Sequence, residues 1–231
     1  MKHLKIFLKN ILFSSIYGIK FWQFIKAVTL LRQKNFRELF FAIKKDDICL
    51  DLGANYGYAS LIMWLKGAKF IYALEPNKMA LNLLRINLKG IKNIQIIDKA
   101  ISSNNKKQNL YLHKDIKNLN QNKKILELSQ ASSLISSKKN IGKCFYEIEA
   151  ITLDDLYMNL LFKPSIIKCD IEGGEYLIYE QLIRLAKSNI VRKIFVECHN
   201  KKYPQFKNLH SQFIKLIDEN NLNKIINTKW H

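Results

Sequence analysis

The sequence is poor in the residues that make long linkers or covalent cross-links. Its 231 residues include only three prolines and eight glycines, which excludes a collagen-like chain and disfavours an architecture built from linkers. The four cysteines contain no CxxC pair, so a zinc or thioredoxin-type site has little support. We expect small buried thiols in a reducing compartment. A chain of this length accommodates one domain with an appendage rather than two full domains.

Long apolar runs are missing from the N-terminal region. Within the first thirty residues the longest uncharged run, Asn10–Ile19, is much shorter than the about 20 apolar residues that cross a bilayer. No small-residue cleavage site follows this run, which argues against a signal peptide. We therefore expect a cytoplasmic protein.

Acidic residues are scarce. The chain has 19 of them against 38 basic residues, which gives a formal net charge of +19. The excess lies mainly in residues 1–45 and secondarily in residues 101–150. A field of this sign favours anionic partners, which include a membrane surface, an anionic small-molecule or glycan acceptor, and nucleic acid. The charge alone does not choose among them.

The first thirty residues are predicted to form a basic amphipathic helix. At about 100° per residue, one narrow face carries four lysines and the remainder is mainly apolar. These lysines are Lys2, Lys5, Lys9 and Lys20. Two interpretations stay open: the helix packs on the domain with a solvated lysine face, or it lies on an anionic membrane surface as a peripheral contact.

From residue 46 onward, short apolar runs alternate with helical patterns. We predict strands at Asp47–Leu52, Lys69–Leu74, Asn93–Asp98, Ser165–Asp170, Arg192–Cys198 and Asn223–Thr228, and helices at Tyr58–Lys66, Asn77–Lys89, Gly174–Lys187 and Gln205–Asn220. Repeated β-α units give an α/β fold, with a mostly parallel sheet and helices on both faces. Residues 1–45 are thus a basic helical segment, and residues 46–231 are one domain.

Residues 101–143 interrupt this alternation. They are rich in Ser, Asn and Lys, and they predict only a short strand at Asn109–Leu112 before an insertion. Such an insertion is either a flexible loop or a lid on the substrate side. The segment Glu147–Leu156 then predicts a strand and a turn capped by Thr152 and Asp155.

The first predicted strand runs into a glycine-containing loop that a helix follows. Gly53 suits the tight turn out of the strand, and Gly57 lets the backbone approach a ligand closely. Glu75 ends the second strand, where an acid accepts hydrogen bonds from the ribose hydroxyls of an adenosine ligand. No GK[ST] follows the glycines, which disfavours a phosphate-binding loop. Asp51 instead suits a cationic cofactor, and S-adenosylmethionine carries both an ammonium and a sulfonium group.

Five segments together resemble one known family. DLGANYGYAS, ALEPN, ITLDDL, IIKCDIEGGEY and IFVECH occur in the order and approximate spacing of the FkbM-family S-adenosylmethionine-dependent methyltransferases. The resemblance implies a class I, Rossmann-like methyltransferase fold and, commonly, methylation of a hydroxyl on a sugar or other natural-product acceptor. It also implies cofactor contacts: to the methionine and adenosine side from Asp51, Gly53, Ala54, Asn55 and Gly57, to the ribose from Glu75 beside Pro76, and to adenine from Asp98 to Ala100.

Titratable residues are expected to gather where two later strands end. Asp170, Glu172 and Glu175 follow one strand, and Glu197 and His199 end the next. Because ligands in open parallel sheets bind at the carboxyl ends of strands, Asp170 is predicted to face the cofactor as well. Asp170, His199 and Glu172 are the predicted catalytic residues. An imidazole with an ordinary pKa of about 6.5 can remove the acceptor proton once a carboxylate such as Asp170 orients it.

Other roles for these residues stay open. Glu172 and Glu175 also suit the N-terminal dipole of the helix that follows them. Asp170, Glu197 and His199 offer oxygen and imidazole ligands of the kind that bind Mg²⁺ or Mn²⁺. A divalent metal is the less favoured interpretation, and we predict none.

The favoured function is S-adenosylmethionine-dependent O-methylation of a sugar, a glycan or a lipid-linked glycan precursor at the inner membrane face. An RNA methyltransferase is an alternative, supported mainly by the charge of +19. The sequence lacks an aromatic-interleaved basic RNA motif and an Asn/Asp-Pro-Pro-Tyr motif, so nucleic acid is not the expected partner. A non-catalytic membrane-surface interaction protein is a further alternative. The glycine loop, Glu75 and the acidic cluster argue against it.

Overall fold

The computed structural model describes residues 16–114, 132–137, 141–199 and 204–230. The predicted lysines Lys2, Lys5 and Lys9 lie outside the described residues. Within these ranges, no helix combines the length and the apolar composition needed to span a membrane.

The centre of the fold is a parallel six-stranded sheet with the order β10-β9-β8-β1-β2-β3. Its strands are β1 (Ile48–Leu52), β2 (Phe70–Leu74), β3 (Ile94–Ile97), β8 (Ile166–Cys169), β9 (Lys193–Val196) and β10 (Ile226–Asn227). All six lie within the predicted strands, because strands buried on both faces appear in sequence as short continuous apolar runs. The last described strand, β10, pairs in parallel with β9, and a single antiparallel bridge joins Glu197 to Lys229 beyond it.

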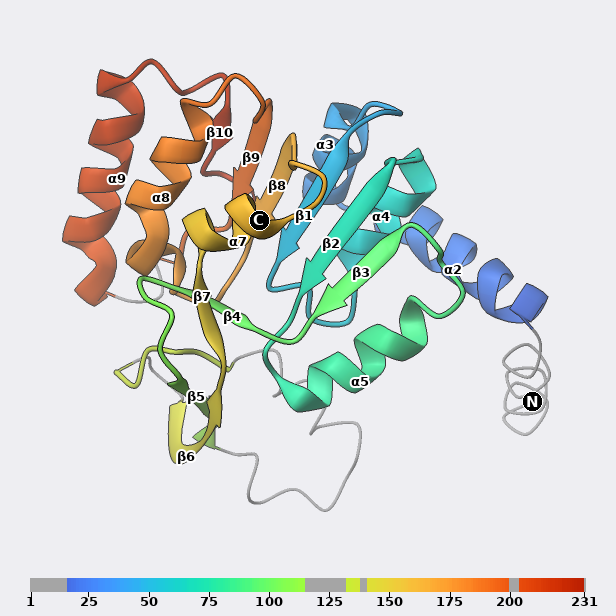
Figure 1. Ribbon diagram of the computed structural model, residues 1–231, viewed down its shortest axis with the longest axis horizontal. Coiled ribbons are helices and arrows are strands. Elements are labelled where there is room, and N and C mark those ends of the chain that lie inside the picture. Colours follow the sequence, from blue (N-terminus) through green and yellow to red (C-terminus); the bar gives the residue numbers. More distant parts are fainter. Residues whose placement is uncertain (1–15, 115–131, 138–140, 200–203, 231) are drawn as a thin grey trace.

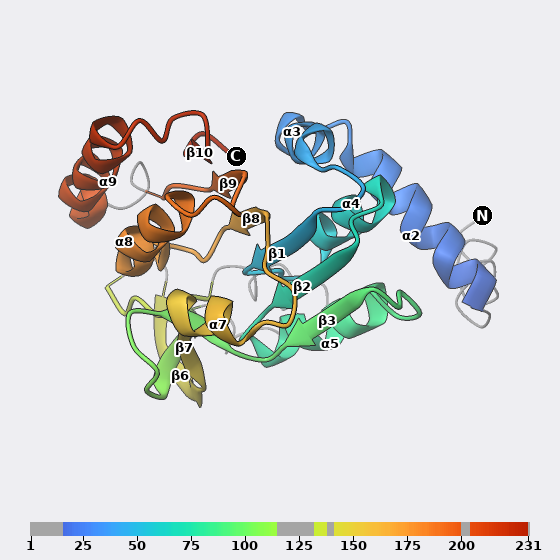
Figure 2. The same ribbon diagram turned by 45° about the horizontal axis from the view of Figure 1, so that its top comes forward.

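Helices cover both faces of the sheet (Figures 1 and 2). One face carries α2 (Ile16–Leu30), α3 (Lys34–Ala42), α4 (Tyr58–Lys66) and α5 (Lys78–Asn87), and the other carries α7 (Leu153–Asn159), α8 (Glu175–Ala186) and α9 (Lys207–Glu219). The sheet supplies both cores, since Leu50 points into the core of α7–α9 and its neighbour Cys49 into the core of α2–α5. This is the α/β architecture that the sequence predicts.

Two predicted caps fix helix starts near the carboxyl ends of the strands. The Asn77 side chain accepts hydrogen bonds from the backbone N–H groups of Met79 and Ala80 at the start of α5. The Thr152 hydroxyl oxygen accepts from the N–H of Asp155 at the start of α7. Each cap satisfies N–H groups that have no partner within the helix, so the helices begin at these residues.

The described part of the N-terminal segment packs on the same core as the sheet. Ala27 of α2 and Leu39 of α3 are fully buried, in one cluster with β1 and α4. The predicted lysine face stays a prediction, because Lys2, Lys5 and Lys9 precede the described residues. Further along α2, the described outward side chains include the exposed Phe21, Phe24, Ile25 and Val28. Lys26 is half-buried, and its ammonium lies 4.4 Å from the centre of the Tyr58 ring.

The predicted insertion is framed by strands. Here β4 (Ala100–Ser102) pairs in parallel with β7 (Ala150–Thr152), and β5 (Gln108–His113) forms an antiparallel hairpin with β6 (Ile141–Ile148). The hairpin projects beyond the carboxyl ends of β1, β2 and β3 (Figure 1). The sequence predicted only the middle of β5 and the end of β6, because β6 is a surface strand whose residues are mostly partly exposed.

Candidate active site

A cavity lies at the carboxyl ends of the central strands. Its wall combines the loop after β1, the end of β2, strand β4, residues 132–134 and the loop after β8. The predicted site residues on this wall are Gly53, Asn55, Glu75, Pro76, Ala100, Asp170 and Glu172. The other predicted residues do not line it: Asp51, Ala54, Gly57, Asp98 and His199. The structure therefore separates the predicted set into residues that line the cavity and residues that do not.

The loop after β1 has a backbone that only particular residues can adopt. Gly53 has a φ of +72°, and a Cβ atom there would lie 1.9 Å from the carbonyl oxygen of Asp170. Gly57 has a φ of +82°, and a Cβ atom there would lie 2.7 Å from Leu84 Cδ1. Both positions thus require glycine. Gly53 lets the β1 loop lie against the β8 loop, and Gly57 lets it lie against α5. Asn55 also has a positive φ of 51°, and its buried Oδ1 has no hydrogen-bond partner among the described residues.

Glu75 links this loop to the end of β2. Its Oε2 accepts a hydrogen bond from the N–H of Asn55 at 2.7 Å, and its Oε1 accepts one from the N–H of Asn77 at 2.8 Å. The side chain is buried, and this burial raises the pKa of Glu75 to about 7, although the two N–H donors act in the opposite direction. Each carboxylate oxygen has a second lone pair, so Glu75 can still accept from a ligand in the cavity.

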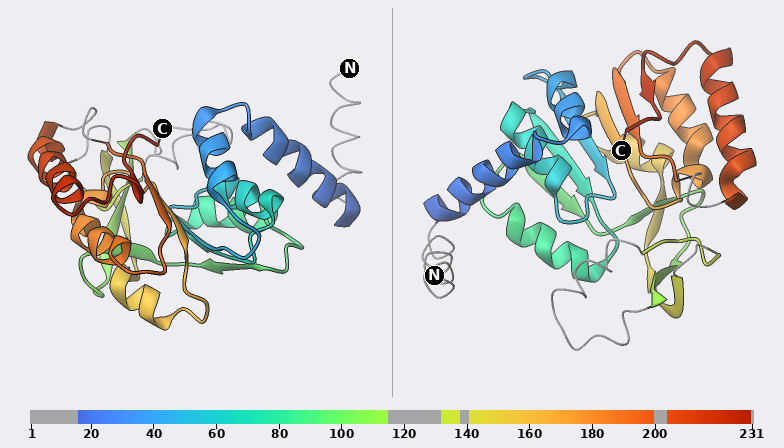
Figure 3. Two further views of the ribbon diagram at one scale, coloured as in Figure 1. Left: turned by 90° about the horizontal axis from the view of Figure 1, so that it is seen from above. Right: turned by 180° about the vertical axis from the view of Figure 1, so that it is seen from behind.

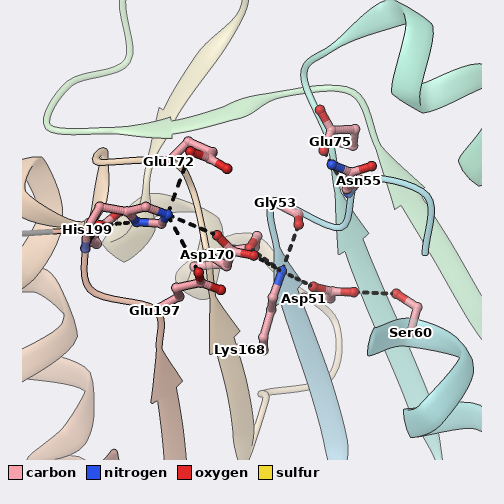
Figure 4. A network of polar contacts seen from close by, with 12 residues as sticks. Asp51, Gly53, Asn55, Ser60, Glu75, Lys168, Asp170, Glu172, Glu197 and His199 are labelled. Atoms are coloured by element: carbon pink, nitrogen blue, oxygen red, sulfur yellow. Dashed lines mark hydrogen bonds and ion pairs between the residues drawn. The ribbon is translucent and has the colours of Figure 1, made fainter. Parts of the chain in front are cut away.

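Asp51 lies beneath the loop instead of facing the cavity. Its side chain is fully buried, the Ser60 hydroxyl donates to its Oδ2 at 2.7 Å, and Lys168 Nζ lies 3.2 Å from its Oδ1. Lys168 also donates to the carbonyl oxygen of Gly53 at 2.8 Å. This buried ion pair holds the loop from below (Figure 4). The structure thus places Asp51 in support of the loop, behind the wall where a cofactor contact was predicted.

His199 is the centre of the acidic cluster (Figure 4). Its Nε2 lies 3.6 Å from a carboxylate oxygen of Glu172, 3.8 Å from one of Glu197 and 4.0 Å from one of Asp170. Its Nδ1 lies 2.7 Å from Oε1 of Glu175, which also accepts from the His199 backbone N–H. The sequence predicted that Asp170 orients this imidazole. The structure assigns that position to Glu175, a fully buried residue at the start of α8.

The four carboxylates change the protonation of the cluster. Burial alone would lower the pKa of His199, but the hydrogen bond and charge of Glu175, with the charges of Glu172 and Asp170, raise it to about 9. The imidazole is therefore protonated at neutral pH, which corrects the expectation of an ordinary value. Burial and the charge of Asp170 raise the pKa of Glu197 to about 7, although His199 acts in the opposite direction. Glu197 is thus the group in this cluster that titrates near neutral pH.

The same residues are compact enough to consider a metal ion. One ligand atom each from Asp170, Glu172 and His199 lies within 4.8 Å of the others. The ligand set considered from the sequence contained Glu197 in place of Glu172. Both carboxylates lie near the same Nε2 atom of His199, at 3.8 Å and 3.6 Å respectively. A protonated His199 already offsets part of the negative charge in this cluster. A bound metal ion and the proton on His199 are therefore alternative ways to offset the negative charge of the same carboxylates. A chelator distinguishes them, because it removes a metal ion and not a proton.

Comparison with known proteins identifies the chain. Residues 51–224 match the Methyltransferase FkbM domain, which covers most of the chain and both sides of the cavity. The chain belongs to the FkbM methyltransferase family. It is an S-adenosylmethionine-dependent methyltransferase with a Rossmann-like fold.

Solved structures resemble this FkbM methyltransferase only distantly. A precorrin-6y C5,15-methyltransferase from Geobacter metallireducens is 14% identical, with a TM-score of 0.42, over 80% of this chain and 70% of that one. M. capricolum TrmK, solved with S-adenosylhomocysteine, is 12% identical with a TM-score of 0.26, over 82% of this chain and 98% of that one. A search of curated proteins found no match. The family therefore rests on the domain match.

The cavity of this FkbM methyltransferase fits its cofactor in three respects. The Asn55 Oδ1 is a buried acceptor in need of a donor. Glu75 is a carboxylate with lone pairs left for ribose hydroxyls. Asp170 and Glu172 add negative charge to the wall, which suits a cationic ligand. The assignment of these residues to cofactor contacts stays a prediction.

We expect the affinity for S-adenosylhomocysteine to depend on pH through Glu75. The raised pKa, about 7, means that Glu75 is largely protonated below that pH. Ribose hydroxyl donors favour the ionised form, so binding releases a proton and weakens as the pH falls. Titration calorimetry should show about a tenfold loss of affinity between about pH 8 and about pH 6. Buffers of different ionisation enthalpy should report the released proton.

A Glu75→Gln variant should lose this pH dependence and bind more weakly by about 1.5–3 kcal/mol at the higher pH, the contribution of charge-assisted hydrogen bonds. Glu197→Gln is the matched control, because Glu197 also has a pKa of about 7 but does not line the cavity. This control should keep the wild-type pH dependence. Wild-type affinity in Glu75→Gln would contradict the assignment.

Two residues of the site were not recognised for their roles from the sequence. The apolar pattern predicts a strand that contains Lys168 but assigns the lysine no role, although a lysine within a buried apolar strand needs a buried partner. Glu175 was considered for a helix dipole, and its hydrogen bond to His199 depends on a contact between α8 and the end of β9. The lysine was a usable signal, whereas the Glu175 contact was not visible in the sequence.

Proposed function

We propose that this enzyme transfers a methyl group to a hydroxyl of a sugar, a glycan or a lipid-linked glycan precursor. The observation that carries the proposal is the position of Asp170. Its partly exposed carboxylate lines the cavity and is also in contact with the His199 cluster. A carboxylate so placed can accept a proton from a hydroxyl bound in the cavity and share it with the groups behind it.

The residues of the chain divide the work as follows. Asp170 accepts a hydrogen bond from the acceptor hydroxyl and takes its proton as the new O–C bond forms. Glu197 has a pKa of about 7, which is close to neutral pH, so it can accept that proton and release it to solvent. The protonated His199 stabilises the carboxylates around it. When bound, the cofactor would supply an electrophilic methyl group on a positively charged sulfur, with S-adenosylhomocysteine as the product.

Positioning is expected to contribute more than proton removal. Alignment of two reactants in a cavity contributes about 7–11 kcal/mol when the reacting atoms are held about 3–3.5 Å apart. The two loops that meet at Gly53 and Asp170 provide a rigid wall for this alignment, because no side chain separates them. An anionic acceptor is consistent with Lys99 on the same wall and with the basic charge of the chain.

The direct test is acceptor screening with cofactor labelled at the methyl carbon. Neutral sugars, anionic sugars, lipid-linked glycans and total RNA should be offered in parallel. We expect label in a sugar-containing acceptor, in a linkage that survives alkali, as a methyl ether does and a methyl ester does not. Label only in RNA, or only in an alkali-labile ester, would contradict the proposal.

The rate at saturating cofactor should identify the group that takes the proton. If the Asp170–Glu197 pair accepts it, the rate should rise with pH through about 7, where Glu197 ionises, and then level off. If His199 accepts it, the imidazole must first lose its own proton, so the rate should keep rising to about pH 9. Activity that EDTA removes and Mg²⁺ restores would instead make Asp170, Glu172 and His199 metal ligands.

A further inference from the structure

Among its described side chains, helix α2 has one face that packs against the domain and an apolar face that is exposed. Gln23, Ala27 and Leu30 form the inner face and are buried. The opposite face consists of Phe21, Phe24, Ile25 and Val28, which are between 41% and 57% exposed. Their i, i+3, i+4, i+7 spacing places these four side chains in one stripe along the helix. We call this stripe the outer face of α2.

The orientation of α2 is fixed by contacts on its inner side. The Gln23 side-chain amide donates to the carbonyl oxygens of Asn87 at 2.5 Å and Lys89 at 3.1 Å, both at the end of α5. Ala27 and Leu30 belong to the core shared with α4 and the sheet. Since this inner side is specified by both polar and apolar contacts, the helix does not turn its outer face inward. The exposure of that face is therefore a property of the fold.

An uncovered stripe of two phenylalanines and two branched aliphatic side chains marks an interaction surface. Its surroundings indicate the partner. Residues 16–45 contain seven basic residues and one acidic residue. Arg32, Lys34, Arg37, Lys44 and Lys45 are all exposed. A second copy of the chain would bring the same positive charge against this one, which opposes self-association.

We propose that the outer face of α2 inserts into the interfacial region of a membrane that contains anionic lipids, with the exposed basic residues in and next to α3 facing the lipid headgroups. A helix that combines an apolar stripe with adjacent cationic side chains binds such a surface in two ways: by burial of the apolar side chains and by electrostatic attraction to the anionic headgroups. The position of α2 leaves room for this, since it extends beyond the edge of the sheet at one end of the molecule (Figure 3). Phe41 of α3, 74% exposed, adds a further aromatic side chain to the same region of the chain.

Co-sedimentation of the full-length protein with vesicles tests this proposal. The wild type should pellet with vesicles of phosphatidylcholine plus phosphatidylserine, far less with phosphatidylcholine alone, and less as salt is added. A Phe24→Ser/Val28→Ser variant should partition at least about tenfold less, because two inserting side chains are lost. Met158→Ser/Leu161→Ser is the matched control, since these side chains are also exposed but belong to α7 and its C-terminal end. This control should pellet like the wild type.

The proposal stands apart from the methyl transfer, because none of the substituted residues lines the cavity. Both variants should keep the wild-type affinity for S-adenosylhomocysteine, which also verifies folding. Equal pelleting of the wild type and the Phe24→Ser/Val28→Ser variant would overturn the proposal. So would a wild-type dimer that this variant dissociates, without any vesicle binding by the wild type. A result of that kind would assign the outer face to self-association.

Discussion

An Asp170→Asn variant should turn over at least about 100-fold more slowly than the wild type, with nearly unchanged affinity for S-adenosylhomocysteine. The substitution keeps the shape of the side chain but removes the charge that accepts the proton. The Asp170 side chain lines the cavity and is 28% exposed, and its Oδ2 lies 3.6 Å from Lys168 Nζ. A single-turnover assay with labelled cofactor measures the loss directly, and calorimetry measures the cofactor affinity.

The matched control for this experiment is Glu172→Gln. Glu172 lines the same cavity, is 30% exposed and lies 3.6 Å from His199 Nε2, the nitrogen that lies 4.0 Å from Asp170. A loss below about tenfold in this control would show that the position of the charge, and not its mere presence in the cluster, carries the effect. If the two variants lose activity in the reverse order, Glu172 is the proton acceptor. Equal activity of Asp170→Asn and the wild type would exclude Asp170.

The sheet and the helices around the site could be predicted because their signals are local. Each central strand is buried on both faces, so it appears in the sequence as a short apolar run, and a helical pattern follows it. Helix α4, Tyr58–Lys66, has the predicted bounds, since Gly57 and Gly67 mark its ends. The Asn77 cap likewise fixes the start of α5 within a few residues. Local rules of this kind do not depend on which strands are neighbours.

The hairpin of β5 and β6 was harder to predict because it is not part of the core. Along β6 the exposed residues Lys143, Phe145 and Glu147 alternate with less exposed ones, so the apolar Phe145 stands on the same side as two charged residues. Its partner β5 precedes it by a long segment, so no short turn motif joins the two strands. A strand at the surface, paired with a distant segment, leaves a weak pattern in the sequence.

The role of Asp51 could not be derived because it depends on strand register. The glycine loop indicates a ligand site, and an acid beside it is a natural candidate for ligand contact. In the structure, β1 and β8 are neighbours, and their parallel register places Asp51 opposite Lys168. Two charged residues at matching positions near the carboxyl ends of two apolar strands are a signal of pairing. The signal has no meaning until the strand order is known.

The Lys168–Asp51 pair provides the largest expected effect on stability. A Lys168→Met variant keeps an unbranched stem of similar length. Among the described residues, it leaves the fully buried Asp51 with the Ser60 hydroxyl as its side-chain hydrogen-bond partner. Removal of one member of a buried ion pair costs about 3–5 kcal/mol, because the remaining charge is uncompensated. Burial alone would lower the pKa of Lys168, but the charges of Asp51 and Asp170 more than offset this and raise it, so the lysine is charged in the native protein. Urea unfolding followed by circular dichroism should show the loss.

Three further variants, one of them the single substitution Asp51→Asn, separate the ion pair from other effects of the Lys168→Met substitution. Lys215→Met removes a lysine that is 75% exposed and bridged only to Glu219, so we expect a change below about 1 kcal/mol. The double variant Lys168→Met/Asp51→Asn removes both charges and should recover part of the stability that Lys168→Met loses, as a coupled pair requires. A double variant whose loss equals the sum of the two single losses would show that the charges are independent. Other contacts of the β1 loop, such as the hydrogen bond from the Asn55 N–H to Glu75, would then account for its stability.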